Sequence, residues 1–173
     1  SKSFQKYKNL ENIKLVIRPG SFIAYGHGYY SQRLANIDKR GGLSINNKNI
    51  KATDLFHPSL ELWAYIISMQ DRNRAILNFG KRDVHFDLGY PIPLAIYRKG
   101  KLIRKIYDTE IQFKIYKMSD QHAFLFYSNH LNIQIGDLIK FGITHPCVTI
   151  DKWDFFYMID KKHTIIEGLK TFF

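Results

Sequence analysis

Two residues near the end of the chain have types that suit metal chemistry. The segment GITHPCVTIDKW, residues 142–153, contains His145 and, two positions later, Cys147, the only cysteine of the protein. In a β-strand this spacing puts both side chains on one face, and imidazole nitrogen and thiolate sulfur are preferred zinc ligands. Without a second cysteine, a zinc ion here would keep open coordination positions, as in catalytic sites. The alternative is a structural role, with a buried free cysteine beside a hydrogen-bonded histidine. From these two residues alone, the structural role is favoured.

Three further segments hold weaker candidates for catalysis or binding, and a structural role competes with a functional one in each. His27 lies between two glycines and among tyrosines in AYGHGYY, where a ligand could approach the backbone closely. Asp120 and His122 fall at a predicted turn in SDQHAF, where a carboxylate could orient an imidazole. Residues 78–89, NFGKRDVHFDLG, form either an anion-binding corner or a charged hairpin. The polar residues gathered there are Lys81, Arg82, Asp83, His85 and Asp87, with Lys81 as the candidate site residue.

Short alternating segments separated by turns indicate an all-β domain, mainly an antiparallel sandwich or barrel, with a short N-terminal helix over Phe4–Lys14. Hairpin turns are predicted at Lys99-Gly100 and near Ser119-Asp120. We expect a helical turn over Ser31–Gly42, ended by Gly41-Gly42, and a loop over residues 45–54. The predicted strands cover Ser21–Tyr30, Leu60–Met69, Arg74–Gly80, both hairpins, two stretches within residues 131–153, and residues 164–173.

The composition describes one folded domain with a strongly basic surface. The chain has 173 residues, of which 45% are hydrophobic and 15% aromatic, and this excludes a disordered protein. One cysteine permits no internal disulfide, and we find no signal peptide or bilayer-spanning run, so we expect a cytoplasmic location without a membrane partner. The net charge of +11 is spread along the chain without a block of five like charges. This pattern indicates a solvated basic surface rather than a nucleic-acid site.

Several segments, taken in order, resemble a known family. The resemblance is carried by VIRPGSFIAYGHGYY, HPSLELWAYIIS, AILNFGKRDVHFDLGYPIPL, DQHAFL, GDLIKFGITHPCVTIDKW and IIEGLKTFF. These segments are similar to the C-terminal domain of the D-serine dehydratase-like family, with the bacterial D-amino-acid deaminases as the nearest branch. The family consists of fold-type III pyridoxal-phosphate enzymes with an alanine-racemase-like architecture. The resemblance runs from about Val16 to Phe173; it implies that residues 1–15 correspond to the last helix of a (β/α) barrel and a linker, and residues 16–173 to the family's β domain.

The resemblance assigns a role to His145 and Cys147. In the family, a histidine and a cysteine of the β domain bind zinc beside the cofactor, and these two residues match that pair. The related D-threonine aldolases have an aspartate at the position of Cys147, so a cysteine, the softer ligand, favours the dehydratase or deaminase branch. The implied reaction is β-elimination of D-serine to pyruvate and ammonia, with pyridoxal phosphate as electron acceptor and zinc as Lewis acid on the departing β-hydroxyl.

The same resemblance implies partners outside this chain. The cofactor lysine belongs to the barrel domain, and no lysine near the N-terminus here stands in a matching motif. We therefore expect a barrel domain in cis or in trans, a homodimer in the full enzyme, a D-amino-acid substrate, and no catalysis by this chain alone. The alternatives are a non-catalytic basic binding module, a D-threonine aldolase-like fragment, or a remnant that preserves only the fold. A pocket shared by His27, His145 and Cys147 would favour the enzyme domain, whereas a basic face with exposed aromatics would favour nucleic-acid binding.

Overall fold

The computed structural model describes residues 24–71, 73–106, 112–128 and 131–172. The helix predicted over Phe4–Lys14, and with it the segment 1–15, lies outside these residues. The described residues form mostly antiparallel strands with a few short helices and contain no (β/α) barrel, which confirms the predicted fold class. No described helix combines the length and the apolar character needed to cross a membrane.

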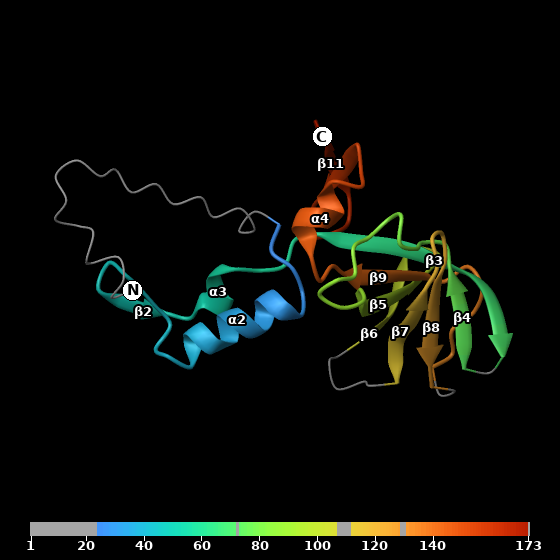
Figure 1. The fold of residues 1–173 in the computed structure, drawn as a ribbon, viewed down its shortest axis with the longest axis horizontal. Helices are drawn as coiled ribbons and strands as arrows, with labels where there is room; N and C mark the ends of the chain where they lie inside the picture. Colours follow the sequence, from blue (N-terminus) through green and yellow to red (C-terminus); the bar gives the residue numbers. More distant parts are fainter. Residues whose placement is uncertain (1–23, 72, 107–111, 129–130, 173) are drawn as a thin grey trace.

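Seven strands form one antiparallel sheet that curls into a half-barrel (Figure 1). They are β3 (Glu61–Asp71), β4 (Arg74–Leu77), β5 (Ile92–Arg98), β6 (Lys101–Lys105), β7 (Phe113–Met118), β8 (Ala123–Tyr127) and β9 (Leu138–Gly142). Their spatial order is β6-β5-β9-β3-β4-β8-β7. The long strand β3 joins the two halves, because its first half pairs with β9 and its second half with β4. β5 also contacts β7 from the opposite end of the order, so the sheet bends round towards closure.

The main hydrophobic core fills the concave side of this sheet. Burial alternates along β8, as expected for a strand with one face in the core. The largest fully buried side chains include Phe141, Ile66 and Leu77, and the Phe141 ring packs against Phe79 with centroids 5.1 Å apart. Burial of one such side chain contributes about 1.5–3 kcal/mol. Phe141 lies one residue before the end of β9, so this core fixes the position where the chain leaves the sheet.

Both predicted hairpin turns are confirmed. Lys99 and Gly100 have φ of 49° and 75°, the pair of positive values that a two-residue type I′ turn needs between β5 and β6. At the other turn, the Ser119 amide donates to the His122 carbonyl at 2.8 Å and closes the β7–β8 hairpin. The predicted strands at Leu60–Met69 and Arg74–Gly80 correspond to β3 and β4.

A small unit of two helices and a hairpin precedes the sheet, and the prediction for its first segment is wrong. The strand predicted over Ser21–Tyr30 is, in its described part, a turn followed by helix α2 (Tyr29–Asp38). Gly28, with φ of 77°, redirects the chain into this helix. The helix predicted over Ser31–Gly42 is confirmed, and the Gly42 amide donates to the Ile37 carbonyl at its end.

The segment 45–54, predicted as a loop, forms regular secondary structure instead. It contains a hairpin of β1 (Leu43–Ile45) and β2 (Lys48–Ile50), followed by helix α3 (Ala52–Leu55). Asn46 and Asn47 have φ of 51° and 62°, so these two asparagines form the type I′ turn that glycine usually forms. The Asp38 carboxylate accepts hydrogen bonds from the first backbone amides of α3 and links the two helices.

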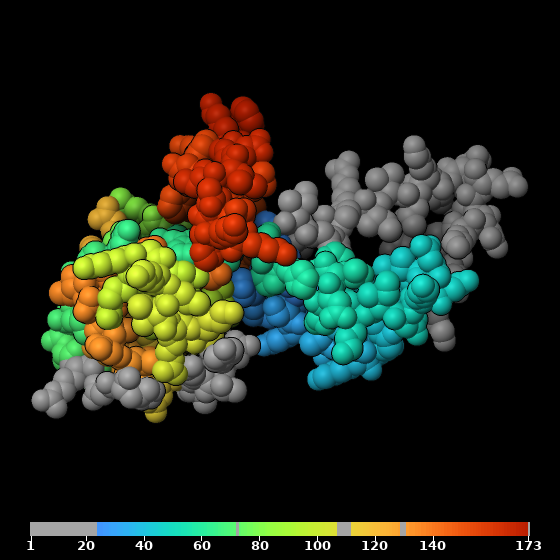
Figure 2. All heavy atoms as spheres, turned by 180° about the vertical axis from the view of Figure 1, so that it is seen from behind, coloured from blue at the N-terminus to red at the C-terminus, as the bar shows by residue number. Residues whose placement is uncertain are grey.

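The C-terminal segment differs from the prediction where it matters for the site. Only one strand, β9, forms among the described residues of 131–153, because the chain turns into helix α4 (Pro146–Ile150). The predicted terminal strand is confirmed as β11 (Ile165–Lys170), which pairs with β10 (Phe155–Ile159) in a separate two-stranded sheet. Figure 2 shows this C-terminal segment, in red, standing out from the half-barrel.

Candidate metal centre

The loop between β4 and β5 is fixed to the β7–β8 turn by backbone hydrogen bonds. The Lys81 and Arg82 amides donate to the carbonyls of Ser119 and Asp120 at 2.9 and 3.0 Å. A Cβ at Gly80 would collide with those same carbonyl oxygens, so the close approach requires glycine at this position. The loop therefore starts from a defined position on the sheet.

The same loop is fixed to helix α4 and to the residues after it. The hydroxyl of Thr149, a residue only 3% exposed, accepts from the His85 amide at 3.2 Å and donates to the His145 carbonyl at 2.9 Å. Beyond the helix, the Trp153 indole donates to the Asp83 carbonyl at 2.6 Å. Side-chain-to-backbone hydrogen bonds thus hold the β4–β5 loop against α4, although some sixty residues separate the two segments in sequence.

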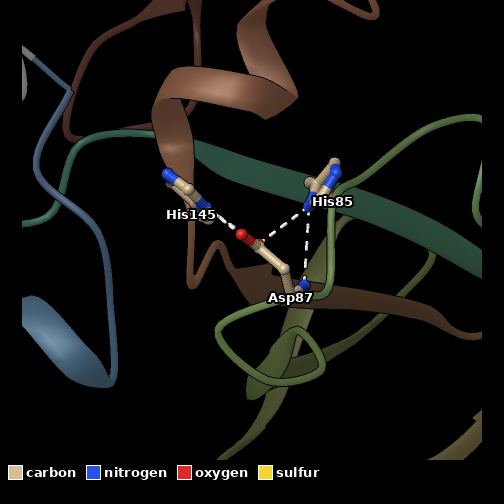
Figure 3. Close-up of side chains that lie close together, drawn as sticks. All are labelled: His85, Asp87 and His145. Atoms are coloured by element: carbon tan, nitrogen blue, oxygen red, sulfur yellow. Dashed lines mark hydrogen bonds and ion pairs between the residues drawn. The ribbon is translucent and has the colours of Figure 1, made fainter.

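At this junction three side chains converge whose types suit a metal ion: His85, Asp87 and His145 (Figure 3). His145 Nδ1 lies 2.8 and 2.9 Å from the two Asp87 carboxylate oxygens, and His85 Nδ1 lies 2.8 Å from Oδ1. One candidate ligand atom from each residue lies within 4.8 Å of the others. The His145 side chain is 18% exposed and that of Asp87 is 43% exposed. The group is therefore mostly buried at His145 and open to solvent at Asp87.

The two imidazoles stabilise the ionised form of the carboxylate. The hydrogen bond from His145 lowers the pKa of Asp87 most, and the hydrogen bond from His85 adds to it. Partial desolvation acts in the opposite direction, and the resulting pKa is about 2. Asp87 is therefore ionised at neutral pH and acts only as an acceptor towards both rings.

Cys147 lies two positions after His145 but not in the geometry that a strand would give. His145 is the residue before the helix, with φ of −130° and ψ of 85°, and Pro146 occupies the first position of α4. The interpretation that both side chains share one strand face is wrong, because the helix begins between them. The Cys147 thiol is exposed and does not belong to the His85–Asp87–His145 group. Its role as a metal ligand stays a prediction.

The weaker candidates fall around the same region without joining the group. The His27 amide donates to the Ile143 carbonyl at 2.7 Å, and its ring packs over Gly142 so closely that a Cβ there would collide with it. His27 therefore lies beside the residues that lead to His145. Lys81 is exposed, with its ammonium group 5.6 Å from the centre of the Phe86 ring.

Asp120 and His122 are both exposed on the β7–β8 turn. Among the described residues, no hydrogen bond joins the Asp120 carboxylate to the His122 ring, although we expected such a pair to orient the imidazole. The contact of this turn with the metal group is indirect, through the Asp120 carbonyl that anchors the loop. Catalytic roles for these residues stay predictions.

Sequence reasoning missed the grouping of His85 and Asp87 with His145. Both residues were placed in an anion-binding corner or a charged hairpin, and neither was paired with the later segment. A local signal was present, since a histidine and an aspartate two positions apart are both metal-ligand types. The distant partner could not be inferred, because 58 residues separate Asp87 from His145.

Residues 59–159 match the family described as "Putative serine dehydratase domain". The chain belongs to this family. The match confirms the resemblance to D-serine dehydratase-like proteins, and it covers the half-barrel, the loop with Asp87 and the helix after His145. No curated protein matches the chain.

One solved structure shares the fold over about two thirds of the chain, and two others match with lower scores. D-threonine aldolase from Filomicrobium marinum is 20% identical, with a TM-score of 0.54, and the match covers 66% of this chain and 28% of that one. D-threo-3-hydroxyaspartate dehydratase from Delftia sp. HT23 is 14% identical, with a TM-score of 0.48, over 64% of this chain and 31% of that one. A metal-free mutant of D-threo-3-hydroxyaspartate dehydratase gives 13% identity and a TM-score of 0.49. The chain thus spans less than a third of the length of each protein.

Proposed function

We propose that this chain is the metal-binding β domain of a pyridoxal-phosphate- and zinc-dependent D-amino-acid dehydratase or deaminase, acting on D-serine to give pyruvate and ammonia. The family match supports the dehydratase assignment. The observation that carries the proposal is the position of His145, the predicted zinc ligand, within a group of metal-ligating side chains.

The residues present fit a zinc ion. Because Asp87 accepts from Nδ1 of His145, the Nε2 lone pair of that ring is available for a metal. Cys147 follows in the first turn of α4 with an exposed thiol, and imidazole with thiolate is a donor pair that zinc prefers. The cysteine is then a ligand and not a nucleophile.

In this proposal His145 and Cys147 hold the ion and leave the other coordination positions for substrate. A zinc ion in such an open site supplies Lewis acidity towards a departing hydroxyl group. The chain's own residues contribute the placement of that ion, through the contacts of Asp87 and Thr149 described above. Pyridoxal phosphate would be bound by a barrel domain, in cis or in trans, within a cytoplasmic homodimer.

Zinc stoichiometry tests the metal site directly. We expect the purified chain to bind close to one zinc ion, and His145→Ala and Cys147→Ala each to lose it. His122→Ala is the matched control, because it removes an exposed imidazole from the neighbouring turn and should keep the ion. Retention of zinc by both site variants would contradict the proposal.

An activity assay tests the requirement for a barrel domain. With D-serine and added pyridoxal phosphate, we expect no pyruvate from this chain alone, since no lysine here matches the cofactor lysine. Pyruvate formation should appear when a barrel domain of the same family is supplied. Release of pyruvate by the chain alone would refute this part of the proposal.

A second candidate function is a non-catalytic basic binding module, and one surface favours it. Arg74, Lys114, Tyr116 and Phe126 line a shallow hollow of about 420 Å³ on β4, β7 and β8. Cations interleaved with aromatic rings suit stacking with single-stranded nucleic acid. Fluorescence anisotropy with a labelled oligodeoxythymidine decides it: binding that Arg74→Ala and Lys114→Ala weaken would support this function, and absence of binding would remove it.

A further inference from the structure

One carboxylate is shared by two imidazoles at the edge of the half-barrel. Asp87 approaches His145 through both of its oxygens, at 2.8 and 2.9 Å, and His85 through one, at 2.8 Å (Figure 3). Both histidines use Nδ1 for this contact, and in the close-up their Nε2 atoms face away from the carboxylate. Within the described ranges, neither Nε2 atom has a hydrogen-bond partner.

The contact with Asp87 determines which tautomer His145 adopts. A carboxylate can only accept hydrogen bonds, so the proton of a neutral His145 ring must lie on Nδ1. The lone pair is then on Nε2, the form in which an imidazole binds a metal ion. A histidine without such a partner would be free to rotate and to exchange tautomers.

Asp87 is itself held by contacts that do not depend on an ion. Its Oδ1 accepts from the Leu88 amide at 3.0 Å as well as from the His85 ring. The Thr149 hydroxyl keeps the backbone of His85 next to that of His145. The position of the carboxylate is thus set by contacts with the protein itself.

We propose that Asp87 is the positioning residue of the metal site, which orients His145 so that Nε2 faces the ion shared with Cys147. In this arrangement His85 restrains the carboxylate and is not a ligand. The inference rests on the proposed function, because it assumes the ion lies on His145 and Cys147. The competing arrangement places the ion directly on His85, Asp87 and His145, whose candidate ligand atoms lie within 4.8 Å of one another.

Imidazole ¹H–¹⁵N NMR of the metal-free chain tests the orientation without any ion. We expect the His145 proton on Nδ1 in the wild-type chain and on Nε2 in Asp87→Ala, since neutral imidazole in water prefers the Nε2 tautomer. Asp87→Glu keeps a carboxylate, which can only accept, and serves as the conservative control. Asp87→Asn adds an N–H donor beside its oxygen and should no longer hold the proton on Nδ1. An Nε2 proton on His145 in the wild-type chain would overturn the inference.

Zinc affinity, measured by competition with a chromophoric chelator, tests the consequence for the metal. Asp87→Ala should weaken zinc binding about 10–100-fold, the range typical for loss of a group that orients a metal-bound histidine. His85→Ala should stay within about threefold of wild type, because it removes only a contact to the carboxylate. Unchanged affinity in Asp87→Ala would overturn the inference while leaving the proposed site intact.

The ligand variants separate this inference from the function on which it rests. If His85→Ala loses zinc as completely as His145→Ala while Cys147→Ala retains it, the ion lies on the three-residue group and the inference is wrong. If His145→Ala and Cys147→Ala both bind zinc as the wild type does, the proposed zinc site itself fails. The cobalt-substituted chain adds a second readout, since a thiolate-to-cobalt absorption band that survives in Asp87→Ala identifies Cys147 as a ligand.

Discussion

The substitution Thr149→Val removes the hydroxyl that joins the loop of His85 to helix α4 and leaves the shape of the side chain unchanged. Two hydrogen bonds are lost, one from the His85 amide and one to the His145 carbonyl. Each contributes about 0.5–1.5 kcal/mol net, so the free energy of unfolding should fall by about 1–3 kcal/mol. The residue is 3% exposed, and water cannot readily replace the hydroxyl.

The same substitution should weaken the metal site, because it frees the backbone that places Asp87 against His145. We expect zinc affinity to fall by about tenfold, the lower end of the range for loss of a metal-orienting contact. Thr149→Ser is the control, since it keeps both hydrogen bonds and loses one buried methyl group, which costs about 0.8 kcal/mol.

Urea unfolding followed by circular dichroism and zinc titration by chelator competition measure the two effects. The reasoning would be refuted if Thr149→Val kept the zinc affinity of the wild type. It would equally be refuted if Thr149→Ser lost as much affinity as Thr149→Val, because volume and not the hydroxyl would then be responsible.

Two further predictions concern the stability of the fold, one in the half-barrel and one in the α2–α3 unit. Phe141→Ala, at a residue that is 0% exposed, should reduce the free energy of unfolding by about 3–5 kcal/mol, whereas Phe172→Ala, at a residue that is 88% exposed, should change it by less than about 0.5 kcal/mol in the same urea experiment. Asp38 has a pKa lowered chiefly by its hydrogen bond from Thr53, so its stabilisation of the α2–α3 unit is full above the ordinary carboxyl pKa and is lost as the pH falls through the folded-state value. Unfolding measured over that acidic range should show this loss in the wild-type chain and not in Asp38→Asn; equal pH dependence in both would contradict the assignment.

The strands and turns that depend on local chemistry were predictable from the sequence. Lys99-Gly100 marks a hairpin because glycine accepts the positive φ that the turn demands. Asn46-Asn47 carries a weaker form of the same signal, and the segment around it was predicted as a loop. The segment around His145 was predicted less well. Its apolar, β-branched residues predict a strand, but Pro146 at the first helical position starts α4.

The candidate site was predictable only in part, for a topological reason. His145 was identified from its own surroundings and from the family resemblance, and the structure places it in a group of metal-ligating types. Its contact with Asp87 depends on two long-range features, the anchoring of the β4–β5 loop to the β7–β8 turn and the bridge through Thr149. Neither feature leaves a periodic pattern in the sequence, because each is made by a single backbone or hydroxyl group.

In the proposed metal site, the contacts that hold His145 in place are distinct from the groups that would meet an ion. The contacts that position His145 come from the buried Thr149 hydroxyl and from the partly exposed Asp87 carboxylate, which two neighbours hold in place. Of the groups that would meet an ion or a substrate, Cys147 is exposed, and the outer nitrogen of His145 faces away from Asp87 (Figure 3). A two-ligand metal site needs that arrangement, because the protein must preset the geometry of few ligands while other molecules complete the coordination. Under the proposed function, the half-barrel positions the metal ligands, and we expect substrate specificity to come from the barrel domain.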